Sequence, residues 1–337
     1  MTVLVTGGAG YIGTHTVVEL VAQGYNVVVV DNFFNSKKEA INRTRHLCGT
    51  DFPFYETDIC NADKLDTIFK KHSIDCVIHF AAYKSGPESV SIPLQYYSNN
   101  LLSTTTLCSV MKNNNVNKII FSSSAAVYST NNQMPLTEES QTGNCPNPYG
   151  WTKYMCEQVL RDTAAAENWS VALLRYFNPI GAHESGSIGE DPLGIPNNLM
   201  PLISQVAVGT RKFINVTGND FPTNDGTCIR DYLHITDLAK GHVAAITYVE
   251  KNTGVNAFNL GLGNGTSVLD IIKAFEAASG TKINYNFAPR RPGDIAVCYS
   301  SANKAARLLN WQATKTIAQA CEDSWRWQSK NPKGYDM

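Results

Sequence analysis

The sequence has no excess of either charge and no long apolar run. Its 28 lysines and arginines against 29 aspartates and glutamates leave a net charge of −1 in 337 residues. A balance this even provides no field for holding a phosphate backbone or an anionic lipid surface, and no apolar run reaches the roughly 18 residues that cross a bilayer. We therefore expect neither nucleic acid nor a membrane as a partner.

Cysteine and histidine are present, but not in metal-binding patterns. The nine cysteines are scattered and never spaced as C-x-x-C, and the seven histidines contain no H-x-x-x-H pair. These patterns predict neither a disulfide framework nor a bound metal. Because the chain reaches a glycine loop by Gly7, it leaves no stretch for a signal peptide, and we expect a cytoplasmic protein with reduced thiols.

Short apolar runs alternate with helical patterns through the first half of the chain. Strands are predicted at residues 3–6, 26–30, 54–56, 76–82, 118–122 and 171–176, with helices at 11–23 and 62–72. This alternation is typical of βαβ units, and a run that is apolar on both faces is typical of a parallel strand covered on both sides. The sequence therefore predicts an α/β protein with a Rossmann-like, doubly wound parallel sheet.

The second half is rich in loops of glycine, proline and asparagine, at 181–197, 218–226 and 289–293. Loops this long in a compact domain are usually functional. We predict a nucleotide-binding domain at residues 1–176 and a smaller mixed α/β substrate lobe at 177–337. Later segments around 237–261, which resemble a helix and a strand, are expected to return to the sheet.

A glycine-rich segment, Thr6–Gly13, follows the first predicted strand and begins the first predicted helix. Its glycines fit G-x-x-G-x-x-G through Gly7, Gly10 and Gly13, and G-x-G-x-x-G through Gly8. In this context glycine lets backbone N–H groups and a helix N-terminus approach a pyrophosphate. The alternative is a tight turn without a ligand.

Two aspartates follow the second and third predicted strands. Asp31 lies 18 residues beyond Gly13, where a carboxylate accepts hydrogen bonds from an adenosine ribose. A 2′-phosphate would be repelled there, and no arginine follows before Arg43, so the sequence favours NAD over NADP. Asp58 has two interpretations, a contact to the adenine edge or a solvated loop residue.

The segment Asn147–Lys153 places a tyrosine and a lysine four residues apart. An N-cap followed by proline predicts a helix start, so that Tyr149 and Lys153 lie one above the other. A serine patch containing Ser124 follows a predicted strand, at the edge where such sheets bind ligands. Moving a phenol pKa from about 10 to about 7 takes roughly 4 kcal/mol, which Lys153 and a cationic nicotinamide can supply. The alternative is a surface tyrosine beside a solvated lysine.

These motifs resemble the extended short-chain dehydrogenase/reductase family over nearly the whole chain, and within it the UDP-galactose 4-epimerases. The segments that carry the narrower resemblance are Phe80–Lys84, Ser122–Tyr128, Arg175–Pro179, Gly181–His183, Ile195–Met200, Arg230–Tyr232 and Arg290–Asp294. The resemblance implies an isomerase that uses NAD and acts on a UDP-hexose. It also implies a homodimer that pairs helices near 100–112 and 149–165.

The resemblance implies a role for each matching residue. Cofactor contacts are implied for Gly7, Gly10, Tyr11, Ile12, Gly13, Asp31, Asn32, Ser36, Asp58, Ile59, Phe80, Ala81, Lys84, Asn99, Tyr149, Lys153 and Phe177. Substrate contacts are implied for Lys84, Ser124, Tyr149, Asn178, Asn198, Leu199, Arg230, Arg291, Asp294 and Cys298. Catalysis is implied for Ser124, Tyr149 and Lys153. The phenolate takes the proton of the sugar 4-hydroxyl with Ser124 bridging the two, while hydride leaves C4 for NAD and returns to the opposite face of a 4-keto sugar.

The implied substrate residues have a chemical rationale. Arg230 and Arg291 can fork onto a pyrophosphate while Asp294 accepts the hydroxyls of the uridine ribose. The alternatives are a simple ion pair between Arg230 and Asp231 and an exposed loop cation at Arg291. Cys298 stands where some related epimerases carry tyrosine, and the smaller side chain predicts room for a 2-acetamido group, hence activity on UDP-N-acetylglucosamine and UDP-N-acetylgalactosamine.

The chain departs from the family pattern at two places, and two rival functions stay open. Ser129 stands where many relatives carry glycine, and Asn215–Thr217 lacks the aromatic residue expected beside the uracil. A dehydratase or decarboxylase would share the first oxidation, but related dehydratases follow the active-site hydroxyl residue with Asp-Glu, and here Ala125 and Ala126 follow Ser124. A noncatalytic NAD-binding regulator would need only the glycine loop.

Overall fold

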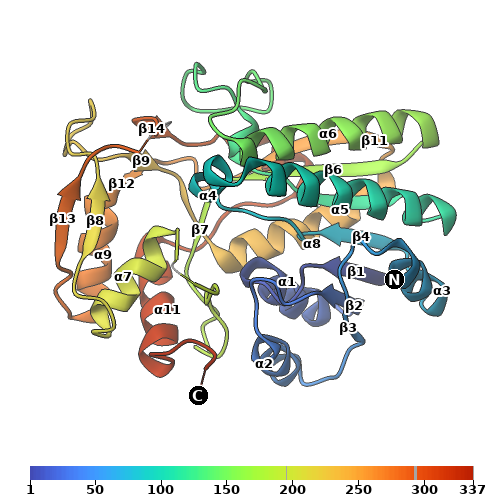
Figure 1. Ribbon diagram of the computed structural model, residues 1–337, viewed down its shortest axis with the longest axis horizontal. Helices are drawn as coiled ribbons and strands as arrows, with labels where there is room; N and C mark the ends of the chain where they lie inside the picture. The colour runs from blue at the N-terminus through green and yellow to red at the C-terminus, as the bar shows by residue number, and fades with distance from the viewer. Residues whose placement is uncertain (195, 292–293, 337) are drawn as a thin grey trace.

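The computed structural model describes residues 1–194, 196–291 and 294–336, and at its centre lies a seven-stranded sheet (Figure 1). The strands are β1 (Thr2–Thr6), β2 (Asn26–Asp31), β3 (Phe54–Glu56), β4 (Cys76–His79), β5 (Lys118–Ser122), β6 (Ser170–Tyr176) and β11 (Gly254–Leu260). Their order is β11-β6-β5-β4-β1-β2-β3, and each neighbouring pair is parallel. The prediction of a doubly wound parallel sheet is confirmed.

Helices cover both faces of this sheet (Figure 1). One layer contains α1 (Tyr11–Ala22), α2 (Lys38–Cys48), α8 (Ile235–Lys251) and α10 (Asn303–Leu309), and the other contains α3 (Ala62–Lys71), α5 (Pro93–Asn113) and α6 (Pro148–Glu167). The predicted helices at 11–23 and 62–72 are confirmed as α1 and α3. The later elements α8 and β11 also belong to this sheet and its helix layers, because α8 packs against α1 and β11 pairs with β6.

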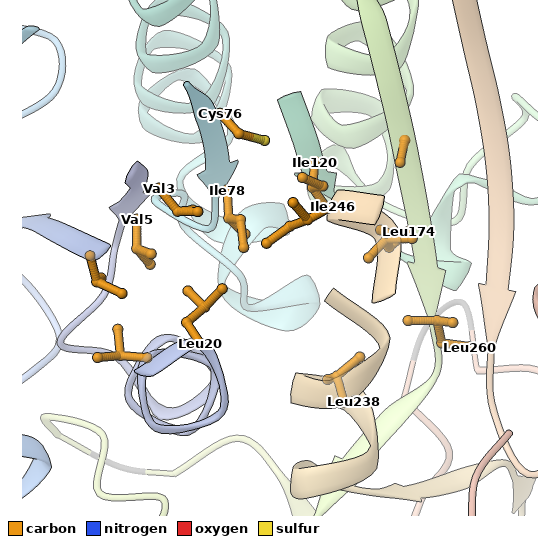
Figure 2. Packing of buried hydrophobic residues seen from close by; sticks show 14 of the residues in the cluster. Val3, Val5, Leu20, Cys76, Ile78, Ile120, Leu174, Leu238, Ile246 and Leu260 are labelled. Atoms are coloured by element: carbon orange, nitrogen blue, oxygen red, sulfur yellow. The ribbon is translucent and has the colours of Figure 1, made fainter. Parts of the chain in front are cut away.

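Alternate residues of each central strand face opposite helix layers. Figure 2 shows the face toward α1 and α8, which includes Val3, Val5, Ile78, Ile120 and Leu174. Their chain neighbours, such as Leu4, Val77, Ile119 and Leu173, face α3, α5 and α6. All nine are fully buried, and each contributes about 1.5–3 kcal/mol by leaving water. This burial on both faces is why the strands read as continuous apolar runs.

The fourth strand is shorter than its apolar run predicts. The prediction extended it to Ala82, but β4 ends at His79, opposite Thr6 at the end of β1. After Thr6 the neighbouring chain turns away at Gly7, where φ is +68°, so the next residues of the run have no strand to pair with on that side. They line a cleft instead.

A second apolar core lies beside the sheet, on the left of Figure 1. It is formed by α7 (Leu199–Ala207), α9 (Val268–Ser279) and α11 (Ile317–Lys330) against β8 (Ile214–Thr217), which pairs with β13 (Tyr285–Ala288). The remaining short elements are β7 (Asn178–Ile180), β10 (Tyr232–His234), β9 (Ile229–Arg230), β12 (Thr266–Ser267), β14 (Val297–Cys298), α4 (Gly86–Ser91) and the 3₁₀ turn η1 (Ala125–Val127).

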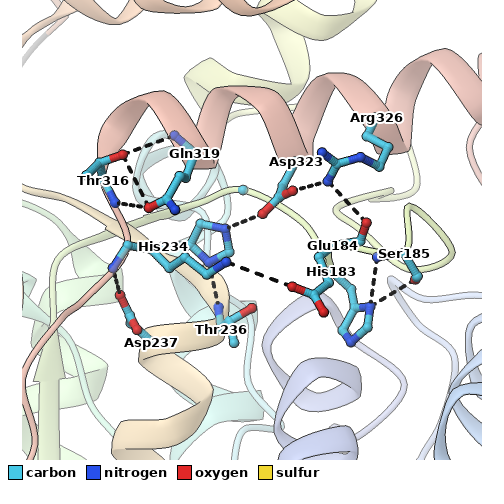
Figure 3. A network of polar contacts seen from close by, with 12 residues as sticks. His183, Glu184, Ser185, His234, Thr236, Asp237, Thr316, Gln319, Asp323 and Arg326 are labelled. Atoms are coloured by element: carbon cyan, nitrogen blue, oxygen red, sulfur yellow. Dashed lines mark hydrogen bonds and ion pairs between the residues drawn. The ribbon is translucent and has the colours of Figure 1, made fainter.

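A polar network joins α11 to the chain between the two cores (Figure 3). Asp323 on α11 lies 3.2 Å from Nε2 of His234 and also pairs with Arg326, which donates to the carbonyl of Glu184 at 3.1 Å. A buried carboxylate is stable only when it is paired in this way. The network fixes the segment that precedes residues 189–192.

None of the helices in the described part of the chain is long and apolar enough to cross a membrane. The described side chains likewise contain no group of three or more His, Cys, Asp or Glu placed to hold a metal ion. All nine cysteines carry free thiols.

Candidate active site

A cleft opens at the carboxyl ends of β1 to β4, where the strand order reverses on either side of β1. Its space is about 1240 Å³, including the part open to solvent. All the predicted cofactor residues except Phe177 line it. Phe177 is instead buried in an apolar cluster with Val127 and Tyr128. Open α/β sheets bind nucleotides at such a switch point.

Gly7 and Gly13 lie so close to neighbouring backbone that no larger residue fits at either position. A Cβ on Gly7 would lie 2.7 Å from the backbone nitrogen of Ala81, and one on Gly13 would lie 2.4 Å from the Gly7 carbonyl oxygen. Gly10 is the N-cap of α1 and supplies no side-chain cap. The first three N–H groups of α1 find no acceptor among the described residues. Free donors at the positive end of a helix fit a pyrophosphate.

Asp31 lies at the end of β2 and fixes the loops on both sides of it. Its Oδ2 accepts a hydrogen bond from the N–H of Ala9 at 3.0 Å, and its Oδ1 accepts from the N–H of Phe33 at 2.8 Å and the hydroxyl of Ser36 at 2.9 Å. Burial raises the pKa of Asp31, and these hydrogen bonds oppose the rise. The carboxylate holds the glycine loop and lines the cleft.

Asp58, for which the sequence left two interpretations, lies on the cleft wall. Its Oδ2 accepts from Nδ2 of Asn32 at 3.1 Å, and its Oδ1 accepts from the N–H of Cys60 at 2.8 Å. The Asp58 side chain is exposed, so these contacts fit both interpretations.

Helix α6 brings Tyr149 and Lys153 to the cleft. Asn147 caps the helix by accepting from the N–H of Gly150 at 3.0 Å, and Pro148 is its first residue, so the predicted helix start is confirmed. Lys153 is buried and Tyr149 is partly buried, and neither is exposed on the helix surface. The interpretation as a surface tyrosine beside a solvated lysine is therefore wrong.

Burial disfavours the charged forms of both groups. It lowers the pKa of Lys153 to about 8, against a smaller opposing effect of Cys156 and Glu157. It raises the pKa of Tyr149, and a hydrogen bond with the Ser124 hydroxyl opposes the rise. Within the described part of the chain, Lys153 is not among the groups that lower the pKa of Tyr149. The chain by itself therefore keeps Tyr149 as a phenol.

Glu157, one helical turn after Lys153, was not singled out in the sequence. It accepts from the hydroxyl of Ser123 at 2.6 Å and pairs with Arg175 through contacts of 2.9 Å and 2.6 Å. Lys153 in turn donates to the carbonyl of Ser122 at 2.8 Å. Successive turns of α6 thus hold Ser122 and Ser123, the two residues that precede Ser124. The four-residue spacing after Lys153 was the available signal.

Glu190, in the loop after β7, was also missed. Its side chain is almost buried, and Oε1 accepts from Nζ of Lys84 at 3.1 Å and from Nδ2 of Asn198 at 2.6 Å. Glu190 thus joins Lys84, a predicted cofactor residue, to Asn198, a predicted substrate residue. Asn198 is the N-cap of α7 and precedes Leu199. No spacing in the sequence indicates the contact with Lys84, because Lys84 lies in another loop, 106 residues before Glu190.

The predicted pyrophosphate and ribose residues lie together at β9 and the loop before β14. Asp294 lies 3.0 Å from Arg291 and 3.8 Å from Arg230. The alternative pair of Arg230 with Asp231 is wrong, because Asp231 is buried and accepts from the hydroxyl of Ser300 at 2.6 Å. Three residues of the quoted motifs, Ile195, Pro292 and Gly293, lie outside the described residues.

Two further predicted substrate residues lie on short strands. Cys298 on β14 is in register with Arg230 and packs against the cluster that contains Phe177. Burial raises the pKa of Cys298 to about 11, so it is a neutral thiol at pH 7. Asn178 begins β7 with its side chain exposed.

The two departures from the family pattern have plain structural settings. Ser129 is not in the left-handed region that favours glycine, and its hydroxyl accepts from the N–H of Asn131 at 3.4 Å, so a serine fits there. Asn215–Thr217 lies within β8, paired with β13, and the Asn215 side chain is exposed.

Comparison with known proteins agrees with this geometry. Residues 3–261 match the model of the NAD dependent epimerase/dehydratase family, and the chain belongs to this family. It is 55% identical over 336 residues to the UDP-glucose 4-epimerase of Bacillus subtilis, covering 99% of each chain. It is 53% identical over 343 residues to that of Drosophila melanogaster, covering 99% of this chain and 98% of the other.

The structure is similar to that of a solved relative. It matches the crystal structure of UDP-glucose 4-epimerase from Bifidobacterium longum in complex with NAD+ and UDP, with a TM-score of 0.97 and 52% identity, over 99% of this chain and 100% of that one. The predicted resemblance to the 4-epimerases is confirmed.

Proposed function

We propose that this chain interconverts UDP-galactose and UDP-glucose by inverting C4, with NAD as its cofactor. The observation that carries the proposal is the position of Tyr149 and Lys153, one above the other on α6 at the cleft that the glycine loop also lines. The high identity to proteins named UDP-glucose 4-epimerase supports the substrate.

The residues of the cleft fit NAD. The free N–H groups at the start of α1 would hold its pyrophosphate, Asp31 its adenosine ribose and Asp58 the adenine edge, with Tyr149 and Lys153 at the nicotinamide. When bound, NAD supplies the hydride acceptor and donor for C4.

Tyr149 takes the proton of the sugar 4-hydroxyl and later returns it, and Ser124 bridges the phenol and the substrate oxygen. Burial favours the neutral phenol and the neutral amine when each is considered alone. A phenolate and an ammonium in one buried site stabilise each other. Lys153, held on the Ser122 carbonyl, therefore supports the base form of Tyr149 through its charge.

The UDP group stays anchored while the sugar turns. Arg230 and Arg291 bind the pyrophosphate, and Asp294, which pairs with both arginines, accepts the uridine ribose hydroxyls. Lys84, Asn178, Asn198 and Leu199 complete the substrate contacts. Because Cys298 is small, the pocket also admits the 2-acetamido sugars UDP-N-acetylglucosamine and UDP-N-acetylgalactosamine.

The rival functions have less support. A dehydratase needs an acid and a base after the active-site serine, and here Ala125 and Ala126 form the 3₁₀ turn η1. A noncatalytic regulator would give no reason for placing Tyr149 and Lys153 together at the cofactor cleft, where desolvation disfavours the charged form of each side chain.

The protein works as a cytoplasmic homodimer in this proposal. The helices expected to pair, α5 and α6, expose Leu102 at 49% and Met155 at 36% of their surfaces. Sedimentation at micromolar concentration should give twice the chain mass, and a monomer would contradict the pairing.

The direct test of the activity is incubation of the purified protein with UDP-galactose, with products identified by NMR. UDP-glucose should form without added NAD and without accumulation of a keto sugar. A dehydrated or decarboxylated product would support the enzyme rivals, and absence of any product would support the regulator.

A further inference from the structure

Two aromatic rings that the proposed mechanism does not use lie at the cleft. Phe34 comes from the loop after β2 and Tyr83 from the loop after β4, and both line the cleft. Their ring centres are 4.6 Å apart with 26° between the planes, a stacked arrangement. Because β2 and β4 flank β1 in the sheet, the stack bridges the two sides of the glycine loop.

Tyr83 is the fixed member of this pair. Asn100 is buried and holds both backbone groups of Tyr83, accepting from its N–H at 2.8 Å and donating to its carbonyl at 3.0 Å. The Tyr83 ring also meets the buried ring of Tyr96 edge-on, with 5.5 Å between ring centres and 67° between planes.

Phe34 is the member free to move. Its side chain is 61% exposed, and the loop holds it by a single backbone hydrogen bond, from its N–H to Oδ1 of Asn32 at 3.0 Å. Among the described aromatic rings, Tyr83 is the partner of Phe34. Opening the stack therefore costs one ring contact and breaks no hydrogen bond or ion pair.

The stack completes a closed ring of chain around the cleft. The loop after β4 is tied to the loop after β7 by Lys84 and Glu190, at 3.1 Å. The loop after β7 is tied to the loop after β2 by Lys37 and Asp191, at 3.0 Å, and by Asn35, which accepts from the N–H of residue 193 at 2.8 Å. The stack joins the loops after β2 and β4. All three loops contribute residues to the lining of the cleft, and two of the three joints between them are polar.

We propose that Phe34 and Tyr83 form an aromatic clasp that retains the dinucleotide between turnovers. The inference rests on the proposed function, in which NAD occupies this cleft. A reaction that takes hydride from C4 and returns it to the same carbon has no net oxidation, so exchange of the cofactor serves no purpose. Retention needs the three joints to be closed during catalysis, and the stack is the joint that opens without breaking a hydrogen bond or an ion pair, so it is the joint whose loss should speed release.

The test is the dissociation rate of NAD, measured by exchange of the bound cofactor against isotope-labelled NAD. Phe34→Ala removes an exposed ring and should accelerate dissociation about three- to tenfold, the effect of losing one aromatic stack. Phe34→Tyr keeps the stack and should dissociate at the wild-type rate. Phe287→Ala is the matched control, because Phe287 is also an exposed ring, 48% accessible and paired with Tyr285, but lies outside the cleft.

A double variant separates the clasp from two independent effects. Phe34→Ala combined with Tyr83→Leu should release NAD no faster than the quicker single variant, because either change opens the same stack. Multiplying effects would overturn the clasp, as would a wild-type rate in Phe34→Ala. A wild-type protein that binds no NAD would instead overturn the proposed function.

Discussion

Tyr149 and Lys153 depend on each other because burial acts against the charge of each. The pKa of Lys153 falls to about 8 and that of Tyr149 rises above its ordinary value. Moving a phenol pKa from about 10 to about 7 takes roughly 4 kcal/mol, and an ammonium group beside the phenolate acts in that direction.

Tyr149→Phe removes the proposed proton acceptor and keeps the ring. Turnover should fall about 10²- to 10⁴-fold, the usual contribution of a positioned base. UDP should bind as before, because Arg230 and Arg291 are unchanged. Steady-state kinetics and calorimetric titration with UDP check both points. A comparable loss of UDP affinity would show that the tyrosine shapes the pocket instead of acting as the base.

Cys298→Tyr tests the size of the sugar site. The larger ring should abolish activity on the two acetamido sugars and spare the plain hexoses, because overpacking acts sterically. Rates of wild type and variant on all four UDP-sugars decide the point. Wild-type inactivity on both acetamido sugars, or equal loss on all four in the variant, would contradict the role of Cys298 in admitting the acetamido group.

The elements that carry the site are held in place partly by residues outside the predicted motifs. Residues 189–191 line the cleft, and the segment after α11 holds them. Tyr335 donates its N–H to Asp191 at 2.8 Å, and its hydroxyl accepts from the N–H of Gly189 at 3.2 Å. Tyr335 is itself buried beside Trp327, with ring centres 4.8 Å apart. The end of the chain therefore supports one wall of the cleft.

Tyr335→Ala should lower the free energy of unfolding by about 3 kcal/mol, as for other buried aromatic truncations, and weaken NAD binding. Tyr335→Phe loses only the hydroxyl contacts with Gly189 and should cost about 1 kcal/mol. Urea unfolding and NAD titration measure the two effects. If Tyr335→Ala were destabilised but bound NAD with wild-type affinity, the segment would support the fold without supporting the cleft.

Across the whole molecule, buried neutral histidines make stability depend on pH. Burial lowers the pKa of His15 and His79 to about 3 and that of His242 to about 4. The unfolded chain binds protons at these groups near pH 6.5, whereas the folded chain does not until the pH is far lower. Each histidine therefore takes stability away as the pH falls from about 6.5 toward its folded pKa.

His242→Leu isolates one of these groups. At pH 5 a histidine that stays neutral in the fold costs about 2 kcal/mol relative to pH 7, so the variant should lose about that much less than wild type between the two pH values. Urea unfolding at both pH values and one fixed NAD concentration measures the loss of unfolding free energy in each protein. Buried carboxylates such as Asp31 are present in both proteins, so their opposing effect cancels when the two losses are subtracted. Equal losses in the two proteins would show that His242 is protonated in the fold.

The parts of this protein that its sequence determined are those set by neighbouring residues. Strands buried on both faces must be apolar at every position, so they are visible as runs. The glycine loop and the capped start of α6 need particular residues at fixed spacing, because a Cβ at Gly7 meets backbone and the Asn147 side chain must reach the N–H of Gly150. The pattern at Tyr149 and Lys153 is likewise confined to one helical turn.

The tertiary structure alone decided the contacts between distant segments. Lys84 and Glu190 are 106 residues apart and Asn35 and Leu193 are 158 apart, and neither pair has a spacing that sequence periodicity could reveal. The end of β4 was decided by where its neighbour β1 turns away. Arg230 pairs with Asp294 because the fold buries the adjacent carboxylate, Asp231, against Ser300. Side chains choose such partners by proximity in space, which follows from the packing of whole elements, whereas helix caps, glycine turns and apolar runs follow from the few residues on either side.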